Sequence, residues 1–236
     1  MIVYEVKHMC GRYSISVSRP ELAEYLNKNY SIEVLPKTIT LPRYNIAPSE
    51  DAVSLINDGH IYRVGLLKWG YVPEYAHDDK KAIINARSET VDKLFSFKKS
   101  FQERRCVLIA DGFFEWERST STKTPYRFAL KNKKLFGFAG LWSVFTDENG
   151  KKTSTTTIIT TKANSLIAGI HDRMPVILDE ELAKIWLDPH IKDPVALKNV
   201  LLPYEPEKME LYQVSSKVNS AIYKDKDVIE PIKKGL

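Results

Sequence analysis

Four short segments of this 236-residue chain hold more polar and reactive side chains than packing alone requires. They are residues 9–12 (MCGR), 85–90 (NARSET), 110–116 (ADGFFEW) and 171–175 (HDRMP). Cys10 supplies a thiol, Glu115 a carboxylate and His171 an imidazole. These are the groups that nucleophilic and acid–base catalysis use. The segments are therefore the first place to look for a reactive site.

Each of these residues also has an ordinary structural interpretation, which is favoured when the residue is taken alone. Cys10 could be a small buried hydrophobe. Asn85 could cap a helix beginning near Ser88. Glu115 could lie on the solvent face of a strand, and His171 could cap the end of a helix. The chemistry therefore depends on whether the fold brings the four segments together.

The intervening sequence predicts short strands joined by tight turns. Turn residues at 57–59 and 111–112 each separate two apolar or β-branched runs, as in a hairpin. A third pair is expected at 126–130 and 135–142, and a further strand in the β-branched run 153–161. The complete set of expected strands is 52–56, 61–69, 106–110, 113–116, 126–130, 135–142, 153–161 and 211–214.

Helices are expected between these strands and at their margins. Ser18 can cap a helix whose first turn contains Pro20, with Leu22, Tyr25 and Leu26 on one face. Further helices are expected at 163–170, 179–187 and 194–201. The pattern predicts an α+β fold: a single domain around a largely antiparallel, hairpin-rich sheet with peripheral helices.

Composition narrows the class of protein. Hydrophobic residues make up 43% and charged residues 28%, as in ordinary globular domains. The net charge of +5 permits nucleic-acid binding without demonstrating it. No apolar run is long enough for a membrane span, and the first residues do not form a signal peptide. We expect a cytoplasmic protein that makes no contact with membranes.

Metal and disulfide chemistry have little support in the sequence. The two cysteines, Cys10 and Cys106, cannot form a disulfide scaffold or a Cys-x-x-Cys zinc motif. The five histidines show no pairing at ligand spacing. We therefore expect no metal and no cofactor.

Taken together, the four segments resemble the SOS-response-associated peptidase family, whose members process abasic sites and cross-link to damaged single-stranded DNA. Residues 44–48 (YNIAP) and 67–70 (LKWG) match two further family segments, and all six occur in the family's order from Met9 to about Val214. Phe114 stands where the family usually has Tyr. One such motif is weak evidence, whereas six in order are specific.

The resemblance implies four catalytic residues. Cys10 would form the cross-link, and Asn85 would hold its backbone or thiol. Glu115 would act as general acid and base during sugar ring opening, and His171 would transfer protons during imine formation and reversal.

The resemblance also implies a set of DNA contacts. Arginines would bind the phosphates beside the lesion, and Trp69 and Trp116 would stack on bases, although core packing is the alternative for both tryptophans. The complete set of expected DNA-binding residues is Arg12, Asn45, Pro48, Lys68, Trp69, Arg87, Trp116 and Arg173. The expected partner is single-stranded DNA containing abasic sites, bound by a monomer that associates with the nucleoid.

An N-terminal cysteine suits the reaction that the family resemblance implies. An abasic sugar opens to an aldehyde, which only a neutral amine attacks. An α-amine has a pKa of about 7.7–8.0, against about 10.4 for lysine, so more of it is neutral near pH 7. The thiol can then close on the imine carbon to form a thiazolidine, with an effective molarity on the order of 10⁵ M or more. Such an adduct would protect the lesion during the DNA-damage response.

The residues ahead of Cys10 bear directly on this chemistry. In the family the cysteine follows the initiator methionine, whereas here eight residues precede Met9. We expect 1–8 to be a leader, 9–223 the processing domain and 224–236 a loosely held basic tail. Either Met9 is the true start, which we favour, or the chain cleaves its own leader.

Two other functions remain open from the sequence. A cysteine peptidase could use Cys10 and His171 as nucleophile and base. A non-covalent single-stranded DNA-binding protein could use the arginines and tryptophans alone. The main hypothesis is an enzyme with Schiff-base, lyase-type chemistry and self-cleaving peptidase activity.

Overall fold

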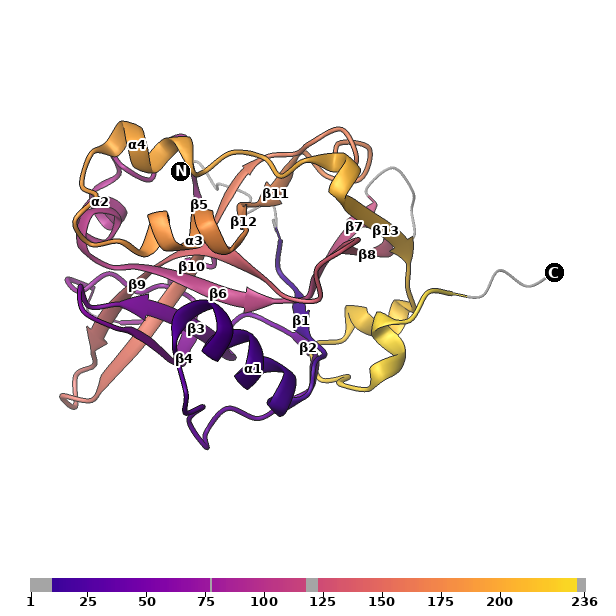
Figure 1. Ribbon diagram of the computed structural model, residues 1–236, viewed down its shortest axis with the longest axis horizontal. Coiled ribbons are helices and arrows are strands. Elements are labelled where there is room, and N and C mark those ends of the chain that lie inside the picture. The colour runs from indigo at the N-terminus through magenta and orange to yellow at the C-terminus, as the bar shows by residue number, and fades with distance from the viewer. Residues whose placement is uncertain (1–9, 77, 118–122, 233–236) are drawn as a thin grey trace.

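Two β-sheets form the body of the protein, and the helices lie around them (Figure 1). The computed structural model describes residues 10–76, 78–117 and 123–232. Nearly all strand pairs within them are antiparallel, so the predicted α+β single domain is confirmed. Within these residues, no helix is long and apolar enough to cross a membrane.

The smaller sheet carries the N-terminal strand. Its neighbours, from edge to edge, are β13 (Met209–Gln213), β8 (Thr124–Leu130), β7 (Gly112–Glu117), β1 (Tyr13–Ile15) and β2 (Arg43–Ile46). Every pair in it is antiparallel. Strand β1 therefore has β7 on one side and β2 on the other.

The larger sheet closes on itself, because β10 pairs with both β4 and β9. Its order is β11 (Arg173–Pro175), β10 (Lys152–Lys162), β4 (Tyr62–Trp69), β3 (Asp51–Asn57), β6 (Arg105–Ala110), β9 (Phe136–Thr146) and β12 (Ile177–Leu178). A short strand, β5 (Asn85–Arg87), adds to β10 in parallel. Strand β10 contains many β-branched residues, which favour extended backbone.

Aromatic contacts join the two sheets. Tyr13 of β1 meets the rings of Trp69 and Phe138 edge-on, with centroids 5.4 and 5.8 Å apart. Phe113 of β7 contacts Phe138 in the same way at 6.0 Å. Edge-to-face pairs of this kind add stability beyond their area of burial. They also fix the position of β1 and β7 on the larger sheet.

The first helix begins as its sequence predicts. In α1 (Arg19–Tyr30), Ser18 and Glu21 form a reciprocal capping box, and Leu22 and Leu26 are buried. The other α-helices are α2 (Phe95–Glu103), α3 (Glu180–Leu187) and α4 (Pro194–Asn199). Three short 3₁₀ helices follow: η1 (Pro206–Lys208), η2 (Ser216–Asn219) and η3 (Lys226–Ile229).

Two of the three expected strand pairs are wrong as hairpins. The hairpin of β3 and β4 is confirmed, but β6 and β7 lie in different sheets, as do β8 and β9. The chain crosses between the sheets at Asp111, where the carboxylate accepts hydrogen bonds from Ser14 and Ser16 and pairs with Arg127. A Cβ at Gly112 would lie 2.5 Å from the Arg127 guanidinium carbon, so a side chain there would displace Arg127 from its ion pair with Asp111. The Asp-Gly pair thus marks a crossing rather than a hairpin turn.

Other local expectations also differ from the structure. Residues 165–170 form consecutive turns instead of a helix. No helix begins near Ser88, because Asn85 lies in β5 and the next helix starts at Phe95. The expected tail is held to the domain, since Val228 is completely buried and the Ile232 N–H donates to the Gln213 carbonyl at 3.0 Å. Residues 233–236 and the expected leader 1–8 lie outside the described residues.

We expect Asp111→Ala to lower the free energy of unfolding by about 3–5 kcal/mol, because it leaves the buried charge of Arg127 without its carboxylate. Urea unfolding measures this. Glu205→Ala is the control, since Glu205 and Lys208 form an ion pair whose side chains are 65% and 58% exposed. Such pairs contribute about 1 kcal/mol or less. If Asp111→Ala lowers the free energy of unfolding no more than the control does, the buried Asp111–Arg127 pair does not stabilise the crossing as we expect.

Candidate active site and nucleic-acid interface

The pairing of β1 with β7 brings Cys10 to Glu115. Tyr13 lies opposite Phe113, and the Phe114 N–H donates to the Arg12 carbonyl at 3.0 Å. Because the strands are antiparallel, the residues just before β1 lie beside Glu115. The backbone N–H of Cys10 donates to Glu115 Oε1 at 2.8 Å. Cys10 is 1% exposed and Glu115 2%, which excludes the solvent-face interpretation of Glu115.

The backbone of Cys10 departs from ordinary strand geometry. Its φ is +28°, a left-handed value that residues with a side chain rarely adopt. Asn85 approaches from β5, where its Nδ2 lies 3.5 Å from the Cys10 carbonyl oxygen. A strained residue held by contacts from two separate strands is typical of a functional position.

His171 is buried beside the strand that holds β5. It follows the turns at 165–170 and precedes β11, which pairs with β10. Its Nδ1 accepts a hydrogen bond from the Arg173 N–H at 3.0 Å and lies 3.1 Å from Asp172 Oδ1. The hydrogen bond from the Arg173 N–H fixes the orientation of the imidazole ring just before β11.

The thiol of Cys10 is held in its neutral form. Burial raises its pKa well above the ordinary value, and the negative charge and hydrogen bond of Glu115 raise the pKa further. A cysteine peptidase needs the opposite, since its nucleophile is a thiolate stabilised by nearby positive charge. The electrostatics of Cys10 therefore do not favour the peptidase alternative.

The three arginines expected at the DNA have different environments. Arg12 is half-buried, and its Nη1 donates to Asn45 Oδ1 at 2.8 Å and to the Val218 carbonyl at 2.6 Å. Arg87 is exposed on β5. Arg173 is 8% exposed and forms a bidentate pair with Glu89. A phosphate would reach Arg173 only if Glu89 moved away.

Two residues expected to touch DNA are internal. Trp69 is completely buried, and its Nε1–H donates to the Ile84 carbonyl at 2.9 Å. This burial favours core packing over base stacking for Trp69. Asn45 is 1% exposed, and it contacts Arg12 and neighbouring carbonyls.

The remaining expected contacts stay predictions. Trp116 is half-buried, and the Arg12 guanidinium lies 5.8 Å from its ring centroid. Pro48 is half-buried, and Lys68 forms an ion pair with Asp79 at 3.4 Å. Sequence reasoning missed Val218 and Asn219, which hold Arg12 and Trp116 from the C-terminal segment. No sequence signal could have found these two contacts, because Val218 and Asn219 are common residue types that lie outside the six motifs.

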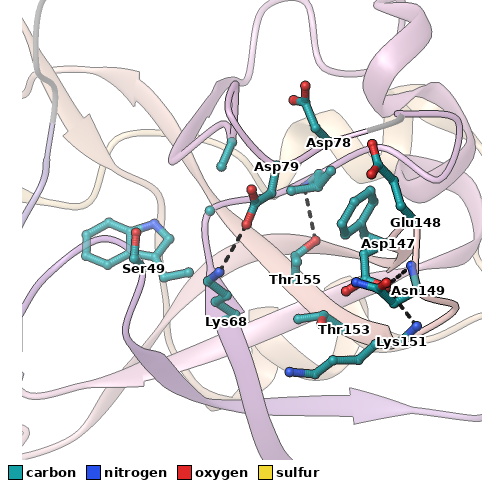
Figure 2. A pocket seen from close by; sticks show the side chains of 15 residues that line it. Ser49, Lys68, Asp78, Asp79, Asp147, Glu148, Asn149, Lys151, Thr153 and Thr155 are labelled. Carbon is teal, nitrogen blue, oxygen red and sulfur yellow. Dashed lines mark hydrogen bonds and ion pairs between the residues drawn. The ribbon is translucent and has the colours of Figure 1, made fainter.

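A cavity of about 340 Å³ lies elsewhere, between the ends of β4 and β10 (Figure 2). Its walls include Lys68 and Lys151 but also four acidic residues, Asp78, Asp79, Asp147 and Glu148. These carboxylates oppose phosphate binding, and Cys10, Glu115 and His171 do not line it. Across the described ranges, no three His, Cys, Asp or Glu side chains converge as a metal site.

Residues 9–221 match the family model described as SOS response associated peptidase (SRAP). The chain belongs to the SRAP family. "Abasic site processing protein YoqW" of Bacillus subtilis (strain 168) is 44% identical to it over 225 residues, covering 94% of this chain and 99% of the relative. "Abasic site processing protein YedK" of Escherichia coli (strain K12) is 27% identical over 225 residues, covering 95% and 100%.

A solved structure supports the fold of this SRAP chain. A protein from Bacteroides thetaiotaomicron superposes with a TM-score of 0.83, covering 95% of this chain and 100% of the other. At 24% sequence identity, this likeness carries information about the fold alone.

We expect Glu115→Gln to speed alkylation of Cys10 by iodoacetamide at pH 8. The charge of Glu115 raises the thiol pKa, so removing it lowers the pKa and increases the reactive thiolate fraction. Mass spectrometry of the labelled peptides measures the rate. Cys106 is the internal control, because burial, not Glu115, raises the pKa of its thiol to about 12. Equal Cys10 rates in the two proteins would contradict this electrostatic account.

Proposed function

We propose that this SRAP protein recognises abasic sites in single-stranded DNA and forms a covalent adduct through the α-amine and thiol of Cys10. The observation that carries the proposal is the 2.8 Å hydrogen bond from the Cys10 nitrogen to buried Glu115. It puts a proton-accepting group on the atom that must become the nucleophile. The names of the relatives, abasic site processing proteins, support the same substrate.

The proposed reaction needs no oxidant or cofactor. The amine of Cys10 adds to the sugar aldehyde at C1′, and the resulting carbinolamine loses water to give an imine. The S–H bond then adds across C=N, with sulfur going to carbon and the proton to nitrogen, closing a five-membered thiazolidine. Closure within one residue is fast because the thiol is already in place.

The neighbouring side chains supply the proton transfers. Glu115 takes a proton from the attacking nitrogen and returns one to the departing hydroxyl. Asn85 stabilises the Cys10 backbone by donating a hydrogen bond from Nδ2 to the Cys10 carbonyl oxygen. His171, oriented through Nδ1, serves opening of the sugar ring and reversal of the imine. The raised pKa of the Cys10 thiol keeps sulfur protonated until the imine has formed.

This chemistry requires a primary amine on Cys10. An amide nitrogen is unsuitable because its lone pair is delocalised into the carbonyl. The proposal therefore requires Cys10 to be the first residue. Either translation starts at Met9 and methionine aminopeptidase removes that residue, or a longer chain cleaves itself just before Cys10. Cysteine is small enough for the aminopeptidase to remove the preceding methionine.

We expect a chain that begins at Met9, freed of its methionine in a bacterial host, to form a heat-stable adduct with an abasic oligonucleotide. Cys10→Ala should lose that adduct, because an alanine amine can form only a transient imine that borohydride traps. Denaturing gels and mass spectrometry measure both. The full chain with Met1 still attached should bind the oligonucleotide without cross-linking.

The same assay separates the alternatives. Alkylating the thiol while leaving the amine free should preserve borohydride trapping but abolish any thiol-dependent proteolysis. A purely non-covalent DNA-binding protein would give no trapped band. A heat-stable adduct of normal yield from Cys10→Ala, or through Cys10 of an intact chain, would overturn the proposed chemistry.

We expect Arg87→Ala to reduce the salt dependence of single-stranded DNA binding. Each phosphate contact contributes a slope of roughly −0.7 in log K against log salt, so losing one contact flattens the slope by about that amount. Fluorescence anisotropy across a salt series measures it. Arg63→Ala is the matched control, since Arg63 is an exposed strand arginine paired with Asp58. Equal slopes for Arg87→Ala and the control would place the DNA path away from β5.

A further inference from the structure

The C-terminal segment forms a second apolar cluster against the smaller sheet. We call residues 214–232 the C-terminal strap. Its Val214, Val218 and Val228 are buried with Phe114 of β7, separate from the main core. Trp116 and Tyr44 pack partly against the same cluster. The strap therefore packs against β7, the strand that carries Glu115, and lies close to Arg12 just before β1.

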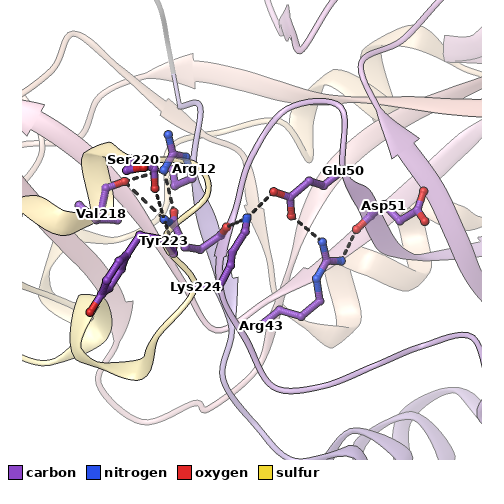
Figure 3. A network of polar contacts seen from close by, with 9 residues as sticks. Arg12, Arg43, Glu50, Asp51, Val218, Ser220, Tyr223 and Lys224 are labelled. Carbon is purple, nitrogen blue, oxygen red and sulfur yellow. Dashed lines mark hydrogen bonds and ion pairs between the residues drawn. The ribbon is translucent and has the colours of Figure 1, made fainter.

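Asn45 connects the strap to β2. Figure 3 shows Val218 and Ser220 of the strap beside Arg12. Asn45 Nδ2 donates to the Ser220 carbonyl at 3.0 Å and to the Tyr223 carbonyl at 2.7 Å. Lys224 returns the contact, donating from Nζ to the Asn45 carbonyl at 2.6 Å and pairing with Glu50. Because Asn45 is 1% exposed, the hydrogen bonds of its side chain to the two carbonyls are protected from water and hold one arrangement of the strap.

The strap then reaches two of the side chains expected to bind DNA, Arg12 and Trp116. The Val218 carbonyl and Asn45 Oδ1 accept from the same nitrogen of Arg12, at 2.6 and 2.8 Å. The adjacent residue, Asn219, accepts from Trp116 Nε1 at 2.6 Å through its side-chain oxygen. Arg12 and Trp116 also contact each other, with the guanidinium 5.8 Å from the ring centroid.

We propose that Asn219 and the Val218 carbonyl are positioning groups that hold Trp116 and Arg12 in the orientation that binds single-stranded DNA. This inference rests on the proposed function. Arginine and tryptophan lose side-chain freedom when they bind a ligand, and a group already fixed in place loses less. Two successive strap residues thus fix one phosphate-binding and one base-stacking side chain as a unit.

The test uses equilibrium binding to a single-stranded oligonucleotide that contains a tetrahydrofuran abasic analogue. This analogue has no aldehyde, so binding is measured apart from cross-linking. Asn219→Ala should weaken binding about fivefold, the loss expected for one hydrogen bond. Trp116→Phe keeps an aromatic ring but removes the N–H donor, so adding Asn219→Ala to it should cause no further weakening. Lys226→Ala, at an exposed strap lysine paired with Glu230, is the control.

The outcomes separate this inference from the proposed function. Unchanged binding by Asn219→Ala, or effects of Asn219→Ala and Trp116→Phe that add in full, would overturn the positioning role. Matching thermal midpoints would show that the variants fold alike. If the unaltered protein binds the analogue with the expected Asn219 dependence but forms no adduct with a true abasic site, the covalent function fails and the positioning role stands. If it binds no single-stranded DNA, both fail.

Discussion

The site depends on a buried carboxylate that meets a backbone nitrogen across two antiparallel strands. Glu115 is 2% exposed, and burying an ionised carboxylate without partners would be strongly unfavourable. The β1–β7 register offers it the N–H of Cys10, which itself has a strained, left-handed φ of +28°. The aromatic contacts of Tyr13 and Phe113 with the larger sheet keep that register fixed. A shift of one residue would place Glu115 on the other face of β7 and separate the two groups.

In the proposed reaction, Glu115 influences both the amine and the thiol of Cys10, and its effects determine which of the two groups reacts first. A carboxylate beside an amine stabilises the protonated ammonium form. The amine can therefore attack only after its extra proton has passed to the carboxylate. The same charge raises the pKa of the Cys10 thiol, which keeps sulfur from competing for the aldehyde as a thiolate. Imine formation therefore comes first and sulfur addition second. This order explains why a cysteine used for cross-linking is kept in surroundings that would suit a peptidase nucleophile poorly.

Local signals were sufficient where the structure is local. The Ser18 helix cap, the β3–β4 turn and the β-branched run of β10 were all predicted, because neighbouring residues alone favour them. The Asp111–Gly112 crossing was not, since Asp-Gly between apolar runs is also the usual signature of a hairpin. The chain crosses between the sheets because buried Asp111 forms an ion pair with Arg127, which lies sixteen residues later in the sequence. The closed sheet likewise depends on pairings between distant strands that no local pattern contains.

The candidate site likewise has one part that local sequence predicts and one part that depends on packing between distant segments. The sequence motifs identified the reactive residue types. They did not distinguish a side chain that can contact a ligand from one that holds a neighbouring side chain in position. Three arginines of the motifs illustrate this: Arg87 is exposed, Arg12 is half-buried against the C-terminal strap, and Arg173 is committed to Glu89. Burial also turns Asn45 into a support for Arg12. A guanidinium with fixed partners is preorganised but has fewer donors left for phosphate. The motifs therefore contain both exposed residues and the buried residues that hold them in place, and only the packing assigns each residue to one of these groups.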